Sequence, residues 1–166
     1  MPAGGWGDLA LRERVEERDA RAIRDLVAGT GFFSPAEIEI ARELAEIAAR
    51  EGDASDYRFL LAGPSGALLG YTCYGQIDGT QSSFDLYWIA VDRKHARRGL
   101  GRRLLAETEA RVARLGGRRL YAETSERPDY APTRAFYEGQ GYLREATLAD
   151  FYAPGDAKAI YVKQLG

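Results

Sequence analysis

The sequence has almost none of the residue types that build metal sites and disulfides. Cys73 is its one cysteine and His95 its one histidine. A single cysteine cannot form an internal disulfide, and one thiol with one imidazole is too few for the usual His/Cys metal clusters. We therefore expect no metal. Cys73 alternates with Tyr71 on an apolar stretch, which predicts a small buried side chain rather than a nucleophile.

Other absences narrow the class of protein further. No apolar run approaches the length of a membrane span, and residues 1–9 lack the charged start and apolar stretch of a signal peptide. The 23 basic and 25 acidic residues nearly cancel, so the chain is not a polycation built to coat nucleic acid or an anionic membrane. We expect a cytoplasmic protein with no membrane partner and no nucleic-acid partner.

The pattern of apolar residues predicts one α+β, or mixed α/β, domain over residues 1–166 around one twisted sheet. With 45% apolar side chains, 166 residues can bury one sizeable core but hardly two. Strands are expected at 8–15, 57–62, 67–77, 82–91, 118–124, 142–152 and 158–165, and helices at 19–31, 34–52, from Leu100 onward and at 131–141.

Buried helix faces are predicted from residues spaced three or four apart. The second helix also carries a capping box, Ser34 to Glu37, and is expected to stop at Gly52. The expected core-facing side chains are Ala22, Ile23, Leu26 and Val27 in the first helix, Ile38, Ala41, Leu44 and Ala48 in the second, and Leu100, Leu104, Leu105, Val112 and Leu115 in the third.

The run HARRGLGRRLL, residues 95–105, follows an apolar strand and opens a helix. A strand, a glycine turn and a helix start together form a common phosphate-binding arrangement, because glycine lets free backbone amides approach the anion. Leu104 stands where the dinucleotide fingerprint needs its third glycine, and the P-loop lysine is also absent. The alternative is a surface helix with a solvated basic rim. The arginines concerned are Arg97, Arg98, Arg102 and Arg103.

Two motifs in order resemble those of the GNAT acetyltransferase superfamily. The coenzyme A loop of that family reads Arg/Gln-x-x-Gly-x-Gly/Ala, and ARRGLG (96–101) matches it at both glycines, with Ala96 at the first position. APTRAFYEGQGY (131–142) is a close version of the second motif, Ala-x-x-Phe-Tyr-x-x-x-Gly-Phe/Tyr. The resemblance covers nearly the whole chain.

The resemblance implies a splayed central mixed sheet flanked by about four helices. The sheet would open between residues 86–91 and 118–124, with acetyl-CoA in the gap and a β-bulge in the strand that ends at Val91. Backbone groups of Ile89 and Val91 would bind the pantetheine, and amides from Arg98 to Arg103 the pyrophosphate. The implied cofactor-binding set is Ile89, Ala90, Val91, Arg97, Arg98, Gly99, Leu100, Gly101, Arg102, Arg103, Tyr130 and Tyr137.

The resemblance also implies catalytic roles. Tyr137 matches the tyrosine that the family uses as general acid toward the departing thiolate, although it could instead be a packed aromatic. Glu123 matches a carboxylate that some members use as general base, and Asp85 is its competitor. Either carboxylate could be solvated or charge-paired instead, and a water relay could serve both.

An acceptor pocket is expected to be lined by aromatic side chains and one carboxylate. The alternatives are sheet packing for the tyrosines and a hydrophobic staple before Ser34 for the phenylalanines. The predicted acceptor residues are Phe32, Phe33, Tyr74, Asp85, Tyr87 and Tyr152.

The function predicted on this resemblance is direct transfer of acetyl from acetyl-CoA to a primary amine of a small molecule, in a ternary complex. One alternative is a coenzyme A-binding sensor or interaction module with the same fold and no turnover. Another is an acetyltransferase for protein or peptide amines. Nucleic-acid binding fits the local arginines but not the acidic overall balance, and a homodimer is compatible with the sequence.

Overall fold

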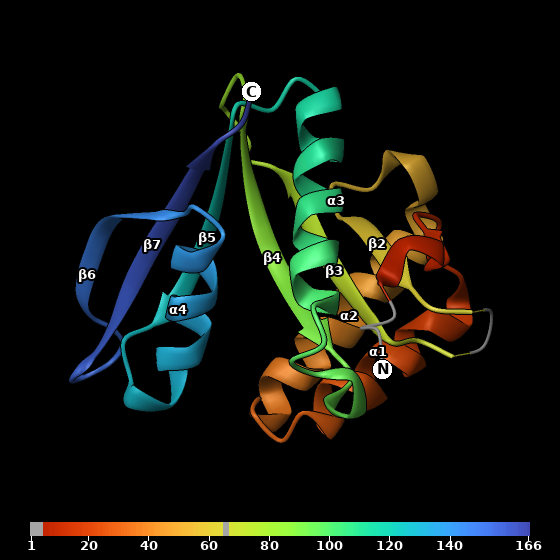
Figure 1. Cartoon of the computed structure of the whole chain (residues 1–166), viewed down its shortest axis with the longest axis horizontal. Helices are drawn as coiled ribbons and strands as arrows, with labels where there is room; N and C mark the ends of the chain where they lie inside the picture. The colour runs from red at the N-terminus through yellow and green to blue at the C-terminus, as the bar shows by residue number, and fades with distance from the viewer. Residues whose placement is uncertain (1–4, 65–66) are drawn as a thin grey trace. The chain divides into compact units, whose positions relative to one another are not determined.

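The computed structural model describes residues 5–64 and 67–166 (Figure 1). Its strands are joined in a seven-stranded sheet of order β1-β2-β3-β4-β5-β7-β6. The chain forms two compact units, one of residues up to Gly75 with Trp88–Thr108, and one of Gln76–Tyr87 with Glu109–Gly166. Strand β4 (Ser83–Val91) and helix α3 (Leu100–Arg114) contribute residues to both. The fold is mixed α+β, as predicted.

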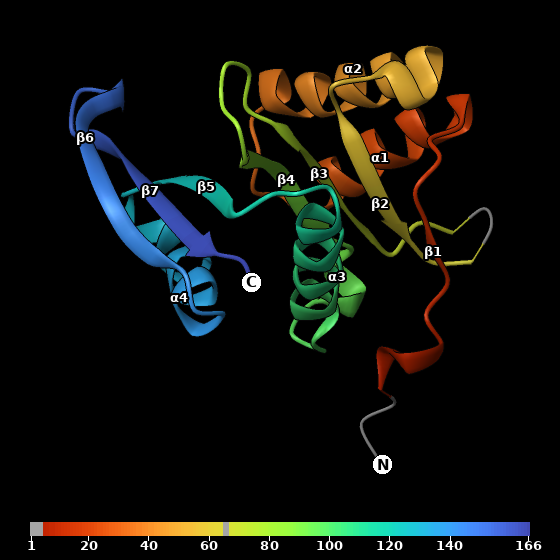
Figure 2. The ribbon, with the colours of Figure 1, turned by 90° about the horizontal axis from the view of Figure 1, so that it is seen from above.

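The first unit holds two helices and the antiparallel start of the sheet. Its elements are η1 (Trp6–Asp8), β1 (Leu11–Arg12), α1 (Glu17–Gly29), α2 (Pro35–Glu51), η2 (Gly52–Ala54), β2 (Arg58–Ala62), β3 (Gly70–Gln76) and η3 (Arg93–His95), with the shared parts of β4 and α3. Figure 2 shows α1 and α2 on one side of β2 and β3, and α3 on the other. The predicted turn at 63–66 lies partly outside the described residues.

The two helix ends predicted for α2 are confirmed. The Ser34 hydroxyl accepts from the Glu37 amide at 3.2 Å, and the Glu37 carboxylate accepts from the Ser34 amide at 2.7 Å. After Glu51 the chain leaves the helix at Gly52, whose φ of 59° is left-handed. Local sequence therefore accounts for both ends of this helix.

The predicted first strand is wrong in length, because only Leu11 and Arg12 pair in the sheet. The Arg12 guanidinium turns away to the Asp19 carboxylate, at 2.6 and 2.9 Å. Asp19 also accepts from the Glu16 amide at 2.7 Å, in a capping box that starts α1 at Glu17, two residues earlier than predicted. The Asp19 carboxylate thus contributes both to the end of β1 and to the start of α1.

Most predicted core positions are buried, with four exceptions, of which Ile38 and Leu44 on α2 are half-buried against the core. Ala20 rather than Ala22 completes the buried face of α1, since Ala22 is only half-buried. Leu115 is 46% exposed because α3 ends at Arg114. Cys73 is fully buried, as predicted, and burial raises the pKa of its thiol.

The second unit is a hairpin-rich half-sheet with one short helix. Its elements are β5 (Arg119–Ser125), η4 (Pro128–Tyr130), α4 (Ala131–Gly139), β6 (Leu143–Ala153) and β7 (Asp156–Gln164), with the shared parts of β4 and α3. β4 and β5 pair in parallel from Ser83–Arg119 to Leu86–Ala122, and β7 pairs antiparallel with both β5 and β6. No helix in the described part of the chain is long and apolar enough to cross a membrane.

Candidate active site

The turn before α3 has the backbone shape of an anion site. Arg97 and Gly99 have φ angles of 60° and 83°, and α3 begins at Leu100. The Arg103 amide donates to the Gly99 carbonyl at 3.0 Å, so the amides ahead of it in the first turn have no acceptor within the helix. A Cβ on Gly99 would meet only a guanidinium nitrogen, 4.0 Å away. The space beside the Gly99 Cα is therefore open, which leaves room for a phosphate to approach this turn.

The four predicted arginines are not equivalent. Arg97, Arg98 and Arg102 are exposed around the turn. Arg103 is half-buried and its guanidinium lies 2.8 Å from the Glu107 carboxylate, which leaves its Nε buried without a protein partner. Three exposed arginines and one half-buried, ion-paired arginine thus surround the helix start.

The residues predicted to bind pantetheine through their backbone, Ile89, Ala90 and Val91, lie at the end of β4. Ala90 is buried, while Ile89 and Val91 are half-buried on either side of it. The Asp92 amide donates to the Leu69 carbonyl at 2.7 Å. The proposed backbone bonds from this strand to pantetheine, and the bulge in it, remain predictions.

Tyr137 lies on α4 in an aromatic cluster of the second unit. Its ring is 5% exposed and stacks on Tyr161 at 6.0 Å between centroids, with Phe136 and Tyr142 each 5.5 Å away. Burial raises the pKa of the Tyr137 phenol well above its ordinary value. The side chain is therefore both tightly packed and neutral at any physiological pH.

The two candidate carboxylates lie together, with a lysine that the sequence analysis missed. The Glu123 carboxylate is 2.5 Å from the Lys158 ammonium, whose side chain is 11% exposed and lies over the Phe151 ring at 4.0 Å. Asp85 makes no hydrogen bond or ion pair through its side chain among the described residues. Burial, and then repulsion by Glu123, raise the pKa of Asp85, against a smaller opposing effect of Lys158.

Strand register places the carboxylates and Tyr137 on opposite faces of the half-sheet. Asp85 is opposite Tyr121 on β5, two residues from Glu123, so both carboxylates are on one face. Ala122 is opposite Tyr161, which packs against Tyr137, so that pair belongs to the other face. An acid and a base on opposite faces can act together only on a substrate that reaches both faces.

The predicted acceptor residues of the first unit are mainly packed side chains. Phe33 lies 5.0 Å from Trp88 and 5.3 Å from Phe32, between ring centroids, and packs against the core formed by α1 and α2. Tyr74 is 2% exposed. Phe32 and Phe33 thus form an apolar corner ahead of Ser34, whereas Tyr74 has little surface to offer a ligand.

The predicted tyrosines of the second unit are more accessible. Tyr87, two residues after Asp85 on β4, and Tyr152 are both exposed. Tyr152 stacks edge-on against Phe151, the ring that covers Lys158. Tyr130 is half-buried with the Arg127 guanidinium over its ring at 5.3 Å.

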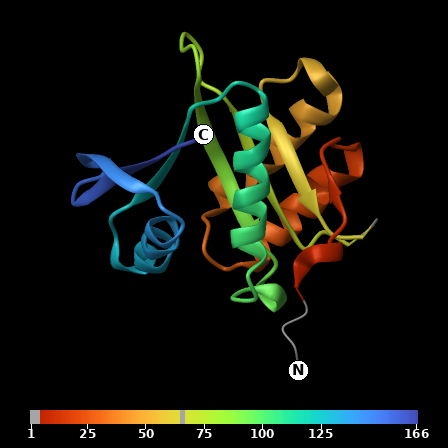
Figure 3. The same cartoon turned by 45° about the horizontal axis from the view of Figure 1, so that its top comes forward.

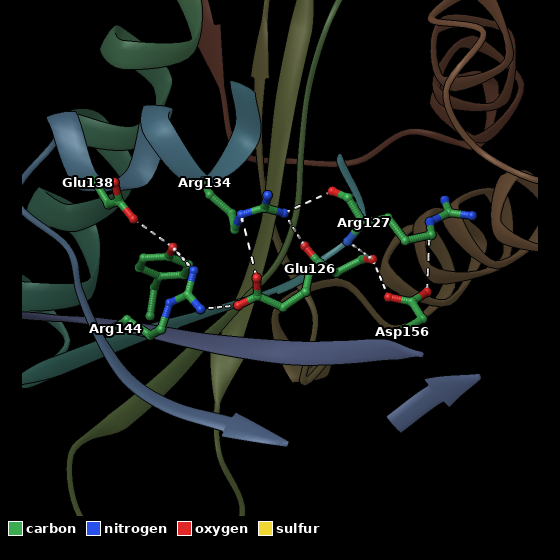
Figure 4. Close-up of polar contacts among 8 residues, drawn as sticks. Glu126, Arg127, Arg134, Glu138, Arg144 and Asp156 are labelled. Atoms are coloured by element: carbon green, nitrogen blue, oxygen red, sulfur yellow. Dashed lines mark hydrogen bonds and ion pairs between the residues drawn. The ribbon is translucent and has the colours of Figure 1, made fainter. Parts of the chain in front are cut away.

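A polar network holds the chain between β5 and α4 (Figure 4). Arg134 donates to the backbone carbonyls of Ser125 and Arg127, at 2.8 and 3.0 Å. Glu126 pairs with both Arg134 and Arg144, the second of which also donates to the Tyr161 hydroxyl at 3.1 Å. The network therefore links the start of α4 to the tyrosine that stacks on Tyr137.

Two side chains near the predicted site could have been noticed from the sequence. Lys158 is a cation directly before the apolar run 159–162, and Trp6 is a lone aromatic in a glycine-rich segment. Neither belongs to a motif. No group of three or more His, Cys, Asp and Glu side chains that could hold a metal ion occurs within residues 5–64 and 67–166.

Comparisons with known proteins agree on one family. The sequence model of the acetyltransferase (GNAT) family matches residues 21–142. A solved GNAT-family protein from Desulfovibrio desulfuricans is 44% identical, with a TM-score of 0.93 over 95% of this chain and 99% of its own. No curated protein sequence matches the chain.

More distant structures share the fold with different acceptors. The ribosomal-protein-S18-alanine N-acetyltransferase of Escherichia coli is 20% identical, with a TM-score of 0.74 over 95% of this chain and 94% of its own. An aminoglycoside 6′-N-acetyltransferase solved with coenzyme A is 16% identical, with a TM-score of 0.72 over 94% of this chain and 96% of its own. Fold alone therefore leaves the acceptor open.

Proposed function

The chain belongs to the GNAT family of acetyltransferases, and from this premise we propose that it moves an acetyl group from acetyl-CoA to a primary amine of a small molecule, directly and without metal, in a ternary complex. The observation that carries the proposal is the turn at Arg97–Gly99, whose left-handed residues lead into the free amides of α3. We further propose a cytoplasmic location.

We assign the pyrophosphate of acetyl-CoA to that turn. The amides of Gly99, Leu100 and Gly101 would donate to its oxygens, and the exposed Arg97, Arg98 and Arg102 would add charge. The open space in front of Gly99 supports this assignment. Bound here, acetyl-CoA supplies an activated thioester, so the protein needs to position the amine and move protons rather than form a covalent intermediate.

We assign the acid role to Tyr137. As the amine nitrogen bonds to the thioester carbon and the carbon–sulfur bond breaks, the departing sulfur needs a proton. A buried phenol stays protonated until that point, which is the state an acid requires. Its raised pKa makes donation unfavourable except to a closely placed thiolate.

We assign the base role to the Asp85–Glu123 pair, with Asp85 as the proton acceptor. Lys158 already pairs with Glu123 at 2.5 Å, which blocks part of the Glu123 carboxylate. Asp85 has no such partner within the described residues, and its raised pKa makes it a better match to an ammonium proton than an ordinary aspartate.

The acceptor is proposed to be a cationic small molecule. The unpaired carboxylate of Asp85 would attract an ammonium group, and exposed Tyr87 and Tyr152 would cover its apolar part. A protein or peptide amine is the second candidate, since the Escherichia coli relative of this fold acts on a ribosomal protein.

A panel of amines tests the proposal. Polyamines, aminoglycosides, amino acids and short peptides are offered with acetyl-CoA, and release of free thiol is followed. We expect turnover with a cationic small molecule, and a rate roughly a hundredfold or more lower with Tyr137→Phe at the same protein concentration. Turnover only with peptides would move the assignment to protein acetylation, and binding of acetyl-CoA without any turnover would indicate a sensor.

A further inference from the structure

The N-terminal segment contacts the turn assigned to the pyrophosphate. Trp6 lies ahead of residues 21–142, the part that matches the family. Its indole N–H donates to the Arg98 carbonyl at 2.7 Å. Figure 3 shows this red segment beside the green turn that precedes α3. All the residues concerned belong to the first unit.

Further contacts fix the indole in place. The Arg98 guanidinium lies over the Trp6 ring, 5.8 Å from its centroid, and the His95 ring meets it edge-on at 6.2 Å. Trp6 and Leu9 also pack against the apolar cluster of Leu60, Ala62, Leu100 and Leu104. The N–H donor is therefore anchored on the first turns of α3, the helix that presents the phosphate-binding amides.

The bond to the Arg98 carbonyl has a geometric consequence for Gly99. The carbonyl of Arg98 and the amide of Gly99 belong to one planar trans peptide, in which C=O and N–H point in opposite directions. A donor that holds the carbonyl on one side therefore aims the Gly99 amide at the other. Gly99, which supplies the amide, and Arg97, one residue before this peptide, both have left-handed φ angles, a conformation that is costly for Arg97 and needs support from its surroundings.

We propose that Trp6 is a positioning residue for coenzyme A: its indole N–H locks the Arg98–Gly99 peptide so that the Gly99 amide faces the pyrophosphate. The inference rests on the proposed function, because it assumes that this turn binds the pyrophosphate. It adds a residue from outside the family motif. Without the bond the peptide would rotate more freely, and part of the binding energy would be spent on ordering it.

The test compares two ligands and two matched variants. Trp6→Phe keeps an aromatic ring under Arg98 but removes the N–H donor, and Trp88→Phe changes the other tryptophan of the chain, which packs on Phe33. Calorimetric titration measures Kd for coenzyme A and for pantetheine, which lacks the pyrophosphate. For Trp6→Phe we expect coenzyme A to bind about five- to tenfold more weakly, the usual effect of one lost hydrogen bond. Pantetheine should bind as to the unchanged protein.

The Trp88→Phe protein provides a second readout, since Trp6 is then its one tryptophan. On titration with coenzyme A, the fluorescence of Trp6 should change and then saturate, with the same Kd that calorimetry gives. This measurement does not depend on how well Trp6→Phe folds. Equal affinity of Trp6→Phe and the unchanged protein for coenzyme A would overturn the inference. An equal loss of affinity for coenzyme A and for pantetheine in Trp6→Phe would also overturn the inference, because it would indicate a general structural role for Trp6. If the unchanged protein does not bind coenzyme A, the proposed function itself fails.

Discussion

Tyr137 is the residue whose role separates an enzyme from a binding module. Tyr137→Phe removes one hydroxyl and keeps the ring that stacks on Tyr161. If the phenol protonates the departing thiolate, turnover should fall roughly a hundredfold or more while the Kd of acetyl-CoA changes little. Steady-state rates and calorimetry on the same preparation measure both. Full activity of Tyr137→Phe would make the hydroxyl structural.

The two carboxylates can be told apart by the pH dependence of the rate. A base works only when deprotonated, so activity should rise with pH through the raised pKa of Asp85. Repulsion by Glu123 contributes to that elevation and Lys158 opposes it. Glu123→Gln should therefore move the acid limb of the profile to lower pH, and Lys158→Met should move it higher.

Asp85→Asn should reduce the maximal rate by about a hundredfold or more at every pH, as expected for a lost general base. Rate–pH profiles of the three variants, taken at saturating acetyl-CoA, check these shifts. If Glu123→Gln abolishes turnover while Asp85→Asn retains it, the assignment of the base is reversed, and Glu123 acts despite its ion pair with Lys158.

At the scale of elements, one carboxylate joins β1 to the start of α1. Burial by itself would raise the pKa of Asp19, but its hydrogen bonds from Arg12 and the Glu16 amide outweigh burial and lower it. A lowered pKa means that the stabilisation is complete above the pKa of the unfolded chain and is lost as pH falls through the folded value.

Asp19→Asn should accordingly destabilise the protein by about 1–3 kcal/mol at neutral pH, because it breaks a partly buried ion pair and weakens a cap. The difference in Tm between the variant and the unchanged protein should shrink as the pH is lowered into the acid range. Thermal melts at several pH values measure this. Glu39→Gln, on the exposed face of α2, is a suitable control with little expected effect. A pH-independent difference would contradict the ion-pair explanation.

Elements with strong local signals were predictable from sequence, and those set by distant contacts were not. The capping box at Ser34 follows from local chemistry and is confirmed. The early end of β1 was missed because it depends on the pairing of Arg12 with Asp19. Lys158 was missed because strand register, rather than spacing along the chain, brings it to Glu123.

At the scale of the whole molecule, the family and its fold could be predicted from two motifs that occur in the expected order along the chain. The acceptor could not be predicted from the sequence. The glycine turn and the segment around Tyr137 contain the two motifs that resemble those of the family, so they carry the family signal. Tyr87 and Tyr152, the exposed side chains proposed to contact the acceptor, lie outside both motifs. The organisation of residues 1–166 as one domain remains a prediction.

The most direct test of the account is calorimetric titration of the unchanged protein and of Gly99→Val with acetyl-CoA. We predict saturable binding at one site per chain and a Tm that rises with the concentration of acetyl-CoA. Ligand at a hundred times its Kd should add about 2.7 kcal/mol to the free energy of unfolding. Gly99→Val should lose this binding, because a branched side chain disfavours the left-handed φ of 83° and fills the space before the amides. Absence of heat and of any Tm shift in the unchanged protein, or undiminished binding by Gly99→Val, would contradict the account.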